Sequence, residues 1–213
     1  MNSILDPSLV LHLPLHKLDG ASFISGDASG HPAVNSGTFW TPRGRSFDGI
    51  DDLIDCGGSP AFDSQQYTLT CWFKTLAPSP DTDIGLRLVN IARAVGGESK
   101  IALRLKNNKA DLFWITPATS IDSISTDVTV NNGRWYHLAG TTDGPIFTVY
   151  LDGDYKASKS SELHTNFYCL CIGSVHTGTG AYGGTIGEAR VYNRVFTALE
   201  IHHDYLSTKW RYQ

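Results

Sequence analysis

Carboxylate side chains are the first residues that could do chemistry in this sequence, because a glycosidase places two of them beside one sugar linkage. The chain has only four glutamates, and Glu188 is the one that falls on a predicted strand. Arg190 lies two residues further on the same face of that strand, which favours a structural ion pair over an acid catalyst. Glu200 is accounted for by a helix cap. The sequence therefore lacks the paired acidic motif of a glycosidase, and the residues favour binding over catalysis.

Aromatic and arginine side chains could instead recognise a sugar, since a ring packs on its C–H face and planar polar groups bond its hydroxyls. Trp72 alternates away from its apolar neighbours onto the face of Lys74, a pattern typical of an amphipathic groove. Tyr182 falls in the glycine-rich segment 178–184, which predicts that a loop presents its ring. Trp135 is predicted to be a core residue. The candidate ligand-binding residues are Trp40, Trp72, Arg87, Arg93, Arg104, Trp114 and Tyr182.

The composition indicates a folded chain with room for a large core. Hydrophobic residues make up 41% of the 213 residues and charged residues 18%, and we expect one domain over residues 1–213. The formal net charge of −4 argues against nucleic acid or an anionic membrane as the main partner, because both attract a basic face. No apolar run is long enough to span a membrane. Residues 1–14 lack a basic leader, so a strand is expected there rather than a signal peptide.

The elements that would position these residues are strands joined by tight turns. Alternating apolar residues predict strands at 9–15 and 67–74, and Asp152-Gly153 predicts a hairpin. Thr197 and Glu200 have the spacing of a capping box, and the helix that they begin is expected to end near Leu206. One short helix after many strands predicts an all-β sandwich of two antiparallel sheets with a C-terminal helix.

Seven segments, in chain order, carry a family resemblance. They include an Asp-x-Ser-Gly loop at 27–30 and a Phe-Asp-Gly turn, followed by Asp51-Asp52, within 46–54. Together they resemble the laminin-G-like, concanavalin-A-like family of jelly-roll sandwiches. The segments are 9–15, 27–31, 46–54, 67–74, 133–139, 149–153 and 186–194, with the helix at 197–205.

The resemblance implies a jelly roll, an extracellular or surface-associated location, and one structural calcium ion. In relatives this ion often lies between the Asp-x-Ser-Gly loop and an aspartate of the final strand. Asp27 supplies the first carboxylate here, but Gly187 stands at the second position. A hard cation needs several oxygen ligands, so Asp27 and backbone carbonyls would have to hold calcium without that aspartate.

The fold alone does not choose among lectins, adhesion domains, glycosidases and lyases. We expect a non-catalytic recognition module that binds a carbohydrate on the concave sheet or the adjoining loops. One alternative is a protein-interaction or structural module of a surface or virion assembly. Another is a glycoside hydrolase or polysaccharide lyase. The expected partner is a glycan or a protein surface, and the sequence leaves the ligand and the oligomeric state open.

Overall fold

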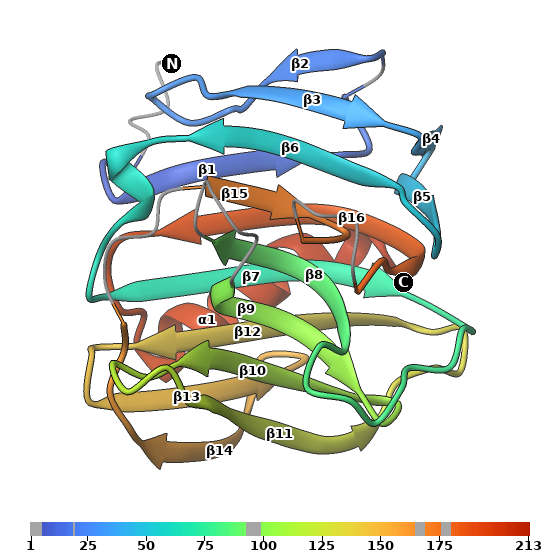
Figure 1. Ribbon diagram of the computed structural model, residues 1–213. Helices are drawn as coiled ribbons and strands as arrows, with labels where there is room; N and C mark the ends of the chain where they lie inside the picture. Colours follow the sequence, from blue (N-terminus) through green and yellow to red (C-terminus); the bar gives the residue numbers. More distant parts are fainter. Residues whose placement is uncertain (1–5, 19, 93–98, 165–168, 176–179) are drawn as a thin grey trace.

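The computed structural model describes residues 6–18, 20–92, 99–164, 169–175 and 180–213. The chain forms two antiparallel sheets that pack face to face, with a helix against one of them (Figure 1). This architecture confirms the predicted jelly-roll sandwich. No helix in the described ranges is long and apolar enough to cross a membrane.

The first sheet, sheet A, has the strand order β14-β13-β12-β7-β16-β5-β4, and β1 also pairs with β16. The last strand of the chain therefore lies inside the sheet, bonded to β1, β5 and β7. The strands of sheet A are β1 Leu9–Pro14, β4 Phe39–Thr41, β5 Gly44–Asp48, β7 Tyr67–Lys74, β12 Trp135–Thr142, β13 Ile146–Leu151, β14 Asp154–Ser160 and β16 Gly183–Tyr192.

The second sheet, sheet B, has the order β11-β10-β9-β8-β15-β6-β3-β2. Its strands are β2 Ser22–Ile24, β3 Pro32–Ser36, β6 Leu53–Gly58, β8 Leu86–Ala92, β9 Ser99–Lys106, β10 Lys109–Ile115, β11 Ile121–Thr129 and β15 Cys169–Ile172. A short 3-10 helix, η1 Pro60–Phe62, follows β6.

The main core lies between the sheets, where alternate residues of each strand point inward. Leu69 and Phe73 of β7 face Leu103 of β9 and Leu112 of β10 across this layer, and all four are buried. The alternation predicted for 9–15 is confirmed, since Leu11, Leu13 and Leu15 are fully buried.

Primed turns connect the hairpins. Asp152 and Gly153 have φ angles of 54° and 81°, and Asn107 and Asn108 have 49° and 61°. A two-residue hairpin turn with positive φ at both positions matches the twist of the flanking strands. The Asp-Gly hairpin predicted from the sequence is confirmed.

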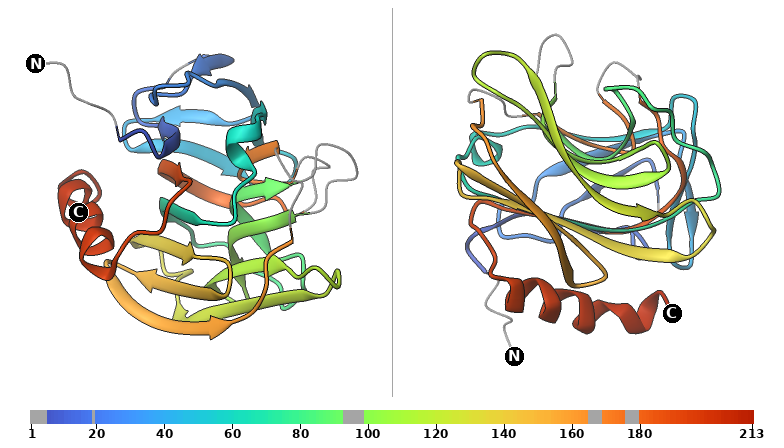
Figure 2. Two further views of the ribbon diagram at one scale, coloured as in Figure 1. Left: turned by 90° about the vertical axis from the view of Figure 1, so that its left-hand side faces the viewer. Right: turned by 90° about the horizontal axis from the view of Figure 1, so that it is seen from below.

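The helix α1 Ala198–Thr208 lies against sheet A on the side away from sheet B (Figure 2). Thr197 and Glu200 form the predicted capping box, with each side chain bonded to the backbone N–H of the other. The helix runs two residues beyond the expected end and continues as the 3-10 turn η2 Lys209–Arg211. This longer C-terminal element covers more of sheet A than the sequence indicated.

Candidate functional site

A row of side chains crosses the outer face of sheet A just beyond the C-terminal element. The strand register places Trp135 of β12 opposite Lys74 of β7, and Lys74 opposite Thr185 of β16. Thr185 is in turn opposite Ser46, and Ser46 opposite Phe39. Directly paired residues of antiparallel strands project from the same face, so the five side chains form one line.

Three neighbouring hollows follow this row, and Lys74 lines all of them. We call the combined surface the Lys74 groove. The first hollow, about 350 Å³, has Trp135, Arg134 and the ring of Tyr212 in its wall. The second, about 330 Å³, shares Arg43 and Trp135 with the first and adds Thr185. The third, about 380 Å³, continues past Thr185 to Asp48. Their shared residues make a continuous, open surface long enough for an extended ligand.

The Lys74 groove is basic at its centre. Arg43, Lys74 and Arg134 are exposed, and none of their side chains forms an ion pair or hydrogen bond with another described residue. Two carboxylates belong to the same surface, Asp152 at one end and Asp48 at the other. Three exposed cations that form no hydrogen bond or close ion pair with a described residue make this groove a local positive region on a chain of net charge −4.

Trp135 is a half-buried ring that the C-terminal turn holds in place. Its centroid lies 4.8 Å from the Tyr212 ring, and Tyr212 stacks on Trp72 at 4.6 Å. A ring packed on one side and open on the other is a preformed platform for an apolar ligand face.

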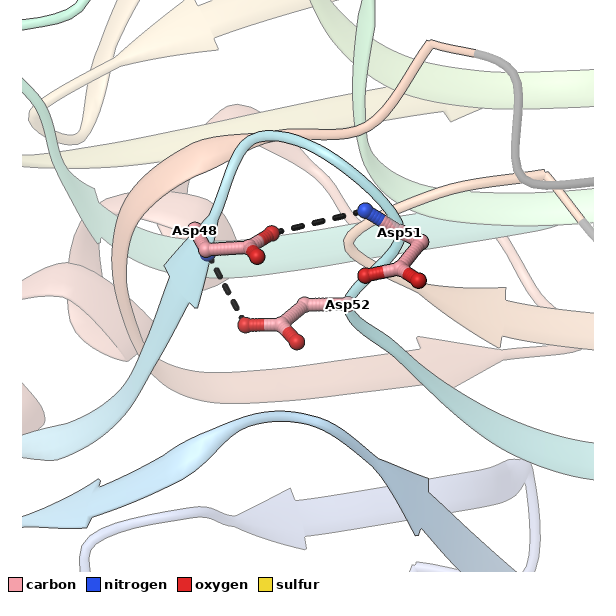
Figure 3. A group of neighbouring side chains, drawn as sticks. All are labelled: Asp48, Asp51 and Asp52. Atoms are coloured by element: carbon pink, nitrogen blue, oxygen red, sulfur yellow. Dashed lines mark hydrogen bonds between the residues drawn. The ribbon is translucent and has the colours of Figure 1, made fainter.

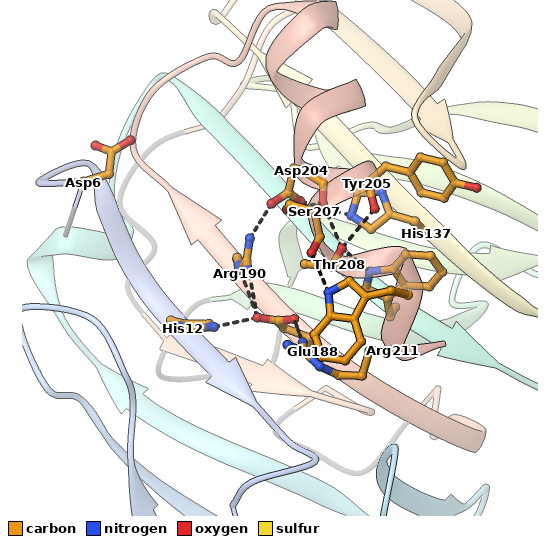
Figure 4. A network of polar contacts seen from close by, with 12 residues as sticks. Asp6, His12, His137, Glu188, Arg190, Asp204, Tyr205, Ser207, Thr208 and Arg211 are labelled. Carbon is orange, nitrogen blue, oxygen red and sulfur yellow. Dashed lines mark hydrogen bonds and ion pairs between the residues drawn. The ribbon is translucent and has the colours of Figure 1, made fainter. Parts of the chain in front are cut away.

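Beneath α1 lies a second polar group, the Glu188 network (Figure 4). The Oε1 atom of Glu188 lies 2.7 Å from Nε2 of His12 and accepts from Nη2 of Arg190 at 2.7 Å, while Oε2 accepts from Arg211 at 2.8 Å. Arg190 also binds Asp204 of the helix. The Glu188–Arg190 pair predicted from the sequence is confirmed, and it ties β16 to the C-terminal element.

The electrostatics of this network do not suit an acid catalyst. The charges and hydrogen bonds of His12 and Arg190 outweigh burial and lower the pKa of Glu188 to about 2. The pKa of Asp204 is also lowered, by His137 and Arg190. A glycosidase acid needs a raised pKa, so these two carboxylates hold the helix rather than donate a proton.

Trp72 lies under the C-terminal element. Its face of β7 is the one predicted, but the ring is stacked between Tyr205 and Tyr212 and only 2% exposed. Its Nε1 donates to Thr208 of α1 at 2.8 Å. The helix therefore covers most of the face at which the sequence suggested a groove, although Trp72 still contributes to the wall of the first hollow of the Lys74 groove.

Trp114 and Tyr182 are core residues. Trp114 stacks on Phe147 with a centroid separation of 3.8 Å, and its Nε1 donates to Ser161. Tyr182 was expected on a loop, but its ring is fully buried and its hydroxyl donates to the backbone oxygen of Lys74 at 2.8 Å. The expected exposure of Tyr182 is wrong because the ring turns back into the sandwich.

The remaining candidates are scattered. Trp40 is 45% exposed, and its Nε1 donates to the backbone oxygen of His16. Arg87 and Arg104 are opposite one another on β8 and β9, and both are buried. Arg93 lies outside the described residues. Of the seven candidates, the register brings only Arg87 and Arg104 together as direct neighbours.

The calcium position implied by the resemblance does not fit the residues present. Asp27 already accepts three backbone N–H groups, from His12 at 3.2 Å, Ser29 at 2.9 Å and Gly30 at 3.1 Å. At Gly187 a Cβ atom would lie 2.3 Å from the Tyr212 ring, so a side chain there has no room. The Asp27 carboxylate therefore holds the 27–30 loop through backbone hydrogen bonds, and position 187 supplies no second carboxylate for a metal ion.

A different acidic cluster could hold a metal ion. Asp48, Asp51 and Asp52 bring ligand oxygens within 4.8 Å of one another in the turn after β5 (Figure 3). Asp48 accepts from the backbone of Ile50 at 2.8 Å, and Asp52 accepts from the backbone of Asp48 at 2.9 Å. These bonds also explain the cluster as the framework of a tight turn.

Sequence reasoning did not select Arg43, Lys74 or Trp135, which line the groove, as binding residues. Trp135 was expected in the core because tryptophan on a strand is usually buried there. The signal was its pairing with Lys74, which requires the register of β7 and β12 and is not visible in either segment alone.

Two antiparallel sheets packed as a jelly roll, with a helix against the outer face of one, define the fold class of this chain. A family model described as the concanavalin A-like lectin/glucanases superfamily matches residues 48–202. The chain therefore belongs to this superfamily, and the resemblance seen in the sequence is confirmed. No curated protein sequence matches the chain.

Solved structures with the same fold include toxin binding domains. The binding domain of Paraclostridial Mosquitocidal Protein 1 is 14% identical, with a TM-score of 0.70 over 94% of this chain and 52% of that one. The ligand binding domain of botulinum neurotoxin serotype D, solved with N-acetylneuraminic acid, is 11% identical, with a TM-score of 0.70 over 95% and 52%. At such identities the likeness establishes the fold alone.

An enzyme also contains this fold. The Trypanosoma rangeli sialidase solved with sialic acid is 17% identical, with a TM-score of 0.72 over 97% of this chain and 34% of that one. The chain thus spans about half the length of the toxin domains and a third of the sialidase. It is similar to one part of each.

Proposed function

We propose that this chain recognises an anionic glycan and binds it along the Lys74 groove. The observation that carries the proposal is the pairing of a half-buried Trp135 ring with Lys74 in an open groove whose three cations are exposed and form no hydrogen bond or close ion pair with a described residue. The ring offers a platform for the C–H face of a sugar, and Lys74 and Arg43 offer donors to a carboxylate or sulfate group.

The comparisons support a lectin-like role without identifying the ligand. The neurotoxin domain was solved with N-acetylneuraminic acid and the sialidase with sialic acid, so two proteins that share this fold over part of their length have been solved in complex with acidic sugars. Acidic sugars would suit the positive centre of the Lys74 groove better than neutral ones.

Binding of purified protein to sialylated, uronate-containing and neutral oligosaccharides, by glycan array and then calorimetry, tests this function. We expect acidic glycans to bind and Trp135→Ala to weaken them about 30-fold, the cost of about 2 kcal/mol typical of a central anchor residue. Lys74→Met should weaken acidic glycans selectively.

Trp210→Ala is the matched control, because Trp210 is 70% exposed and lies outside the groove. It should bind as the parent protein does. Equal binding of neutral and acidic glycans, or no effect of Trp135→Ala, would contradict the proposal.

A second candidate function is contact with a protein through the edge formed by β2, β3 and β4. Ile24, Val34 and Phe39 are 60%, 52% and 74% exposed there, whereas large apolar side chains usually avoid water in such numbers. Light scattering after gel filtration tests it. An oligomer in the parent protein that dissociates to a monomer in Phe39→Ser would favour this function. A parent protein with the molar mass of a monomer, unchanged in Phe39→Ser, would count against self-association.

A further inference from the structure

The third hollow of the Lys74 groove differs in charge from the other two. Among the described residues, the second hollow contains Arg43 and Lys74 and no carboxylate. In the first hollow Arg134 accompanies Asp152. The third hollow has Asp48 as its acidic residue, and its basic residue is Lys74, which all the hollows share. The groove therefore changes from a basic centre to an acidic end.

Asp48 and Lys74 are too far apart to neutralise each other. Gly183 of β16 is directly paired with Asp48 of β5, two positions before Thr185, which is opposite Lys74. Two strand spacings and two residues along the strand separate the Cα atoms of Asp48 and Lys74, a distance of about 12 Å. Within the described part of the chain, neither side chain forms an ion pair. The two charges can therefore act on different units of one ligand.

Asp48 has a carboxylate oxygen available to a ligand. Its Oδ1 atom accepts from the backbone N–H groups of Ile50 at 2.8 Å and Asp51 at 3.4 Å. No described residue bonds its Oδ2 atom, and the side chain is exposed. Carboxylate oxygens of Asp48, Asp51 and Asp52 lie within 4.8 Å of one another, which concentrates negative charge at this end (Figure 3). An ionised carboxylate accepts from hydroxyl groups but repels a second carboxylate.

The third hollow is open because position 183 has no side chain. Gly183 shares the outer face of β16 with Thr185 by strand alternation. A Cβ atom at Gly183 would lie 3.4 Å from the side chain of Ala77 and 3.5 Å from Gly49, so a side chain fits there and would fill the hollow. Leu76 lines the same hollow and is 74% exposed. The volume of about 380 Å³ suits one sugar ring, with Leu76 as an apolar contact for its C–H face.

We propose that Asp48 is a specificity-determining residue and that the third hollow takes an uncharged sugar next to an acidic sugar bound at Lys74, an inference that rests on the proposed glycan-binding function. The carboxylate of the acidic sugar would lie against Lys74 and Arg43. The next ring would pack on Leu76 and donate a hydroxyl to Asp48. A carboxylate on that ring would meet the acidic cluster instead. The groove therefore selects glycans in which acidic sugars have neutral neighbours and discriminates against uniformly charged polyanions.

Calorimetry with trisaccharides that differ only in charge tests this specificity. The probes are cellotriose, cellotriose oxidised to a uronate at the middle ring, and cellotriose oxidised at every ring. EDTA in the buffer keeps divalent ions off the acidic cluster. We expect the singly oxidised trisaccharide to bind most tightly to the parent protein. Asp48→Asn should tighten the fully oxidised trisaccharide about fivefold, the effect of removing one exposed like charge.

The singly oxidised trisaccharide should change less than about twofold in Asp48→Asn, because its carboxylate lies beyond the screening length of about 10 Å at 0.1 M salt. Asparagine keeps the oxygen that accepts from Ile50, so the turn is preserved. Asp143→Asn is the matched control. Asp143 is also an exposed turn residue, it accepts from the backbone of Ile146 at 2.9 Å, and it lies outside the groove. It should leave the affinities of both oxidised trisaccharides unchanged.

Gly183→Leu gives a second reading of the same hollow and serves if Asp48→Asn does not fold. It should weaken the singly oxidised trisaccharide about tenfold by excluding its neutral ring. Unchanged binding in Gly183→Leu, or an equal effect of Asp48→Asn on both oxidised trisaccharides, would overturn the role of the third hollow. If both bind the parent protein and Lys74→Met weakens both, the glycan-binding function survives that result. If neither oxidised trisaccharide binds, both proposals fail.

Discussion

The outer faces of the two sheets carry similar polar groups in opposite states of bonding. Under α1, the two carboxylates of the Glu188 network are balanced by Arg190 and Arg211, and both bind charged partners. On sheet B, Arg87 and Asn90 are also buried, but the Nε and Nη1 atoms of Arg87 and both amide atoms of Asn90 have no hydrogen-bond partner. The same chain thus satisfies the hydrogen bonds of one buried polar cluster and leaves those of another unmade.

This difference separates buried polar groups that stabilise the fold from buried polar groups that do not. A buried network with matched charges fixes the position of the elements that it joins, here β1, β16 and the C-terminal helix. A buried cation whose N–H groups lack hydrogen bonds lowers stability instead. The predictions below test whether the two faces behave in these opposite ways.

The largest expected effect is loss of Arg190. Arg190→Met removes the cation that joins Glu188 to Asp204 and leaves both carboxylates with fewer partners under the helix. We expect the free energy of unfolding to fall by about 3–5 kcal/mol, the cost of breaking a buried ion pair on one side. Urea denaturation measures it. Arg43→Met, on the exposed groove, is the control, and a loss below about 1 kcal/mol would show that the network does not hold the fold.

Acid should weaken the same network. The pKa of Glu188 is about 2 in the folded chain and 4.5 as its reference value, so the unfolded chain takes up the proton first as pH falls. Its contribution, about 3 kcal/mol for a shift of this size, is present above pH 4.5 and is lost as the pH falls towards 2. Unfolding curves across this range test it, with Glu188→Gln as a variant whose profile should be flatter.

Loss of Arg87 should have the opposite sign. Arg87→Met replaces a buried cation that has unbonded N–H groups with an apolar side chain of similar length, so we expect about 2 kcal/mol of added stability. A destabilised Arg87→Met protein would mean that this guanidinium is structural.

The smallest expected effect is at the helix cap. Thr197→Ala removes the hydroxyl that caps the Glu200 amide and should cost about 1 kcal/mol. Hydrogen exchange should become faster in α1 and leave β8 and β9 unchanged, because the cap touches only the helix side of the molecule. Faster exchange in both sheets would show that the two faces are coupled.

Local patterns predicted the strands well because each pattern and its cause lie within a few residues. Alternation in 67–74 set which side chains share a face, and Thr197 with Glu200 set where the helix begins. Alternation does not say what covers a face. Trp72 was placed on the correct side of β7, but the element that buries it comes more than a hundred residues later.

The candidate site was harder to predict for the same reason. The Lys74 groove depends on pairing between β7, β12 and β16, which only the folded register provides. The glycines near Tyr182 indicated a loop but not that its ring points inward to the Lys74 backbone.

The central place of β16 in sheet A sets the order in which this chain can fold. The strand at Gly183–Tyr192 fits between β5 and β7 and also pairs with β1. Strands β5 and β7 have other partners in β4 and β12, whereas the described part of sheet A pairs β1 with β16 alone. During synthesis β1 therefore gains its sheet A partner only after residues 183–192 have been made. Contacts so distant in sequence slow folding and leave strand edges open to other molecules in the meantime. We therefore expect the docking of β1 onto sheet A to be a late step.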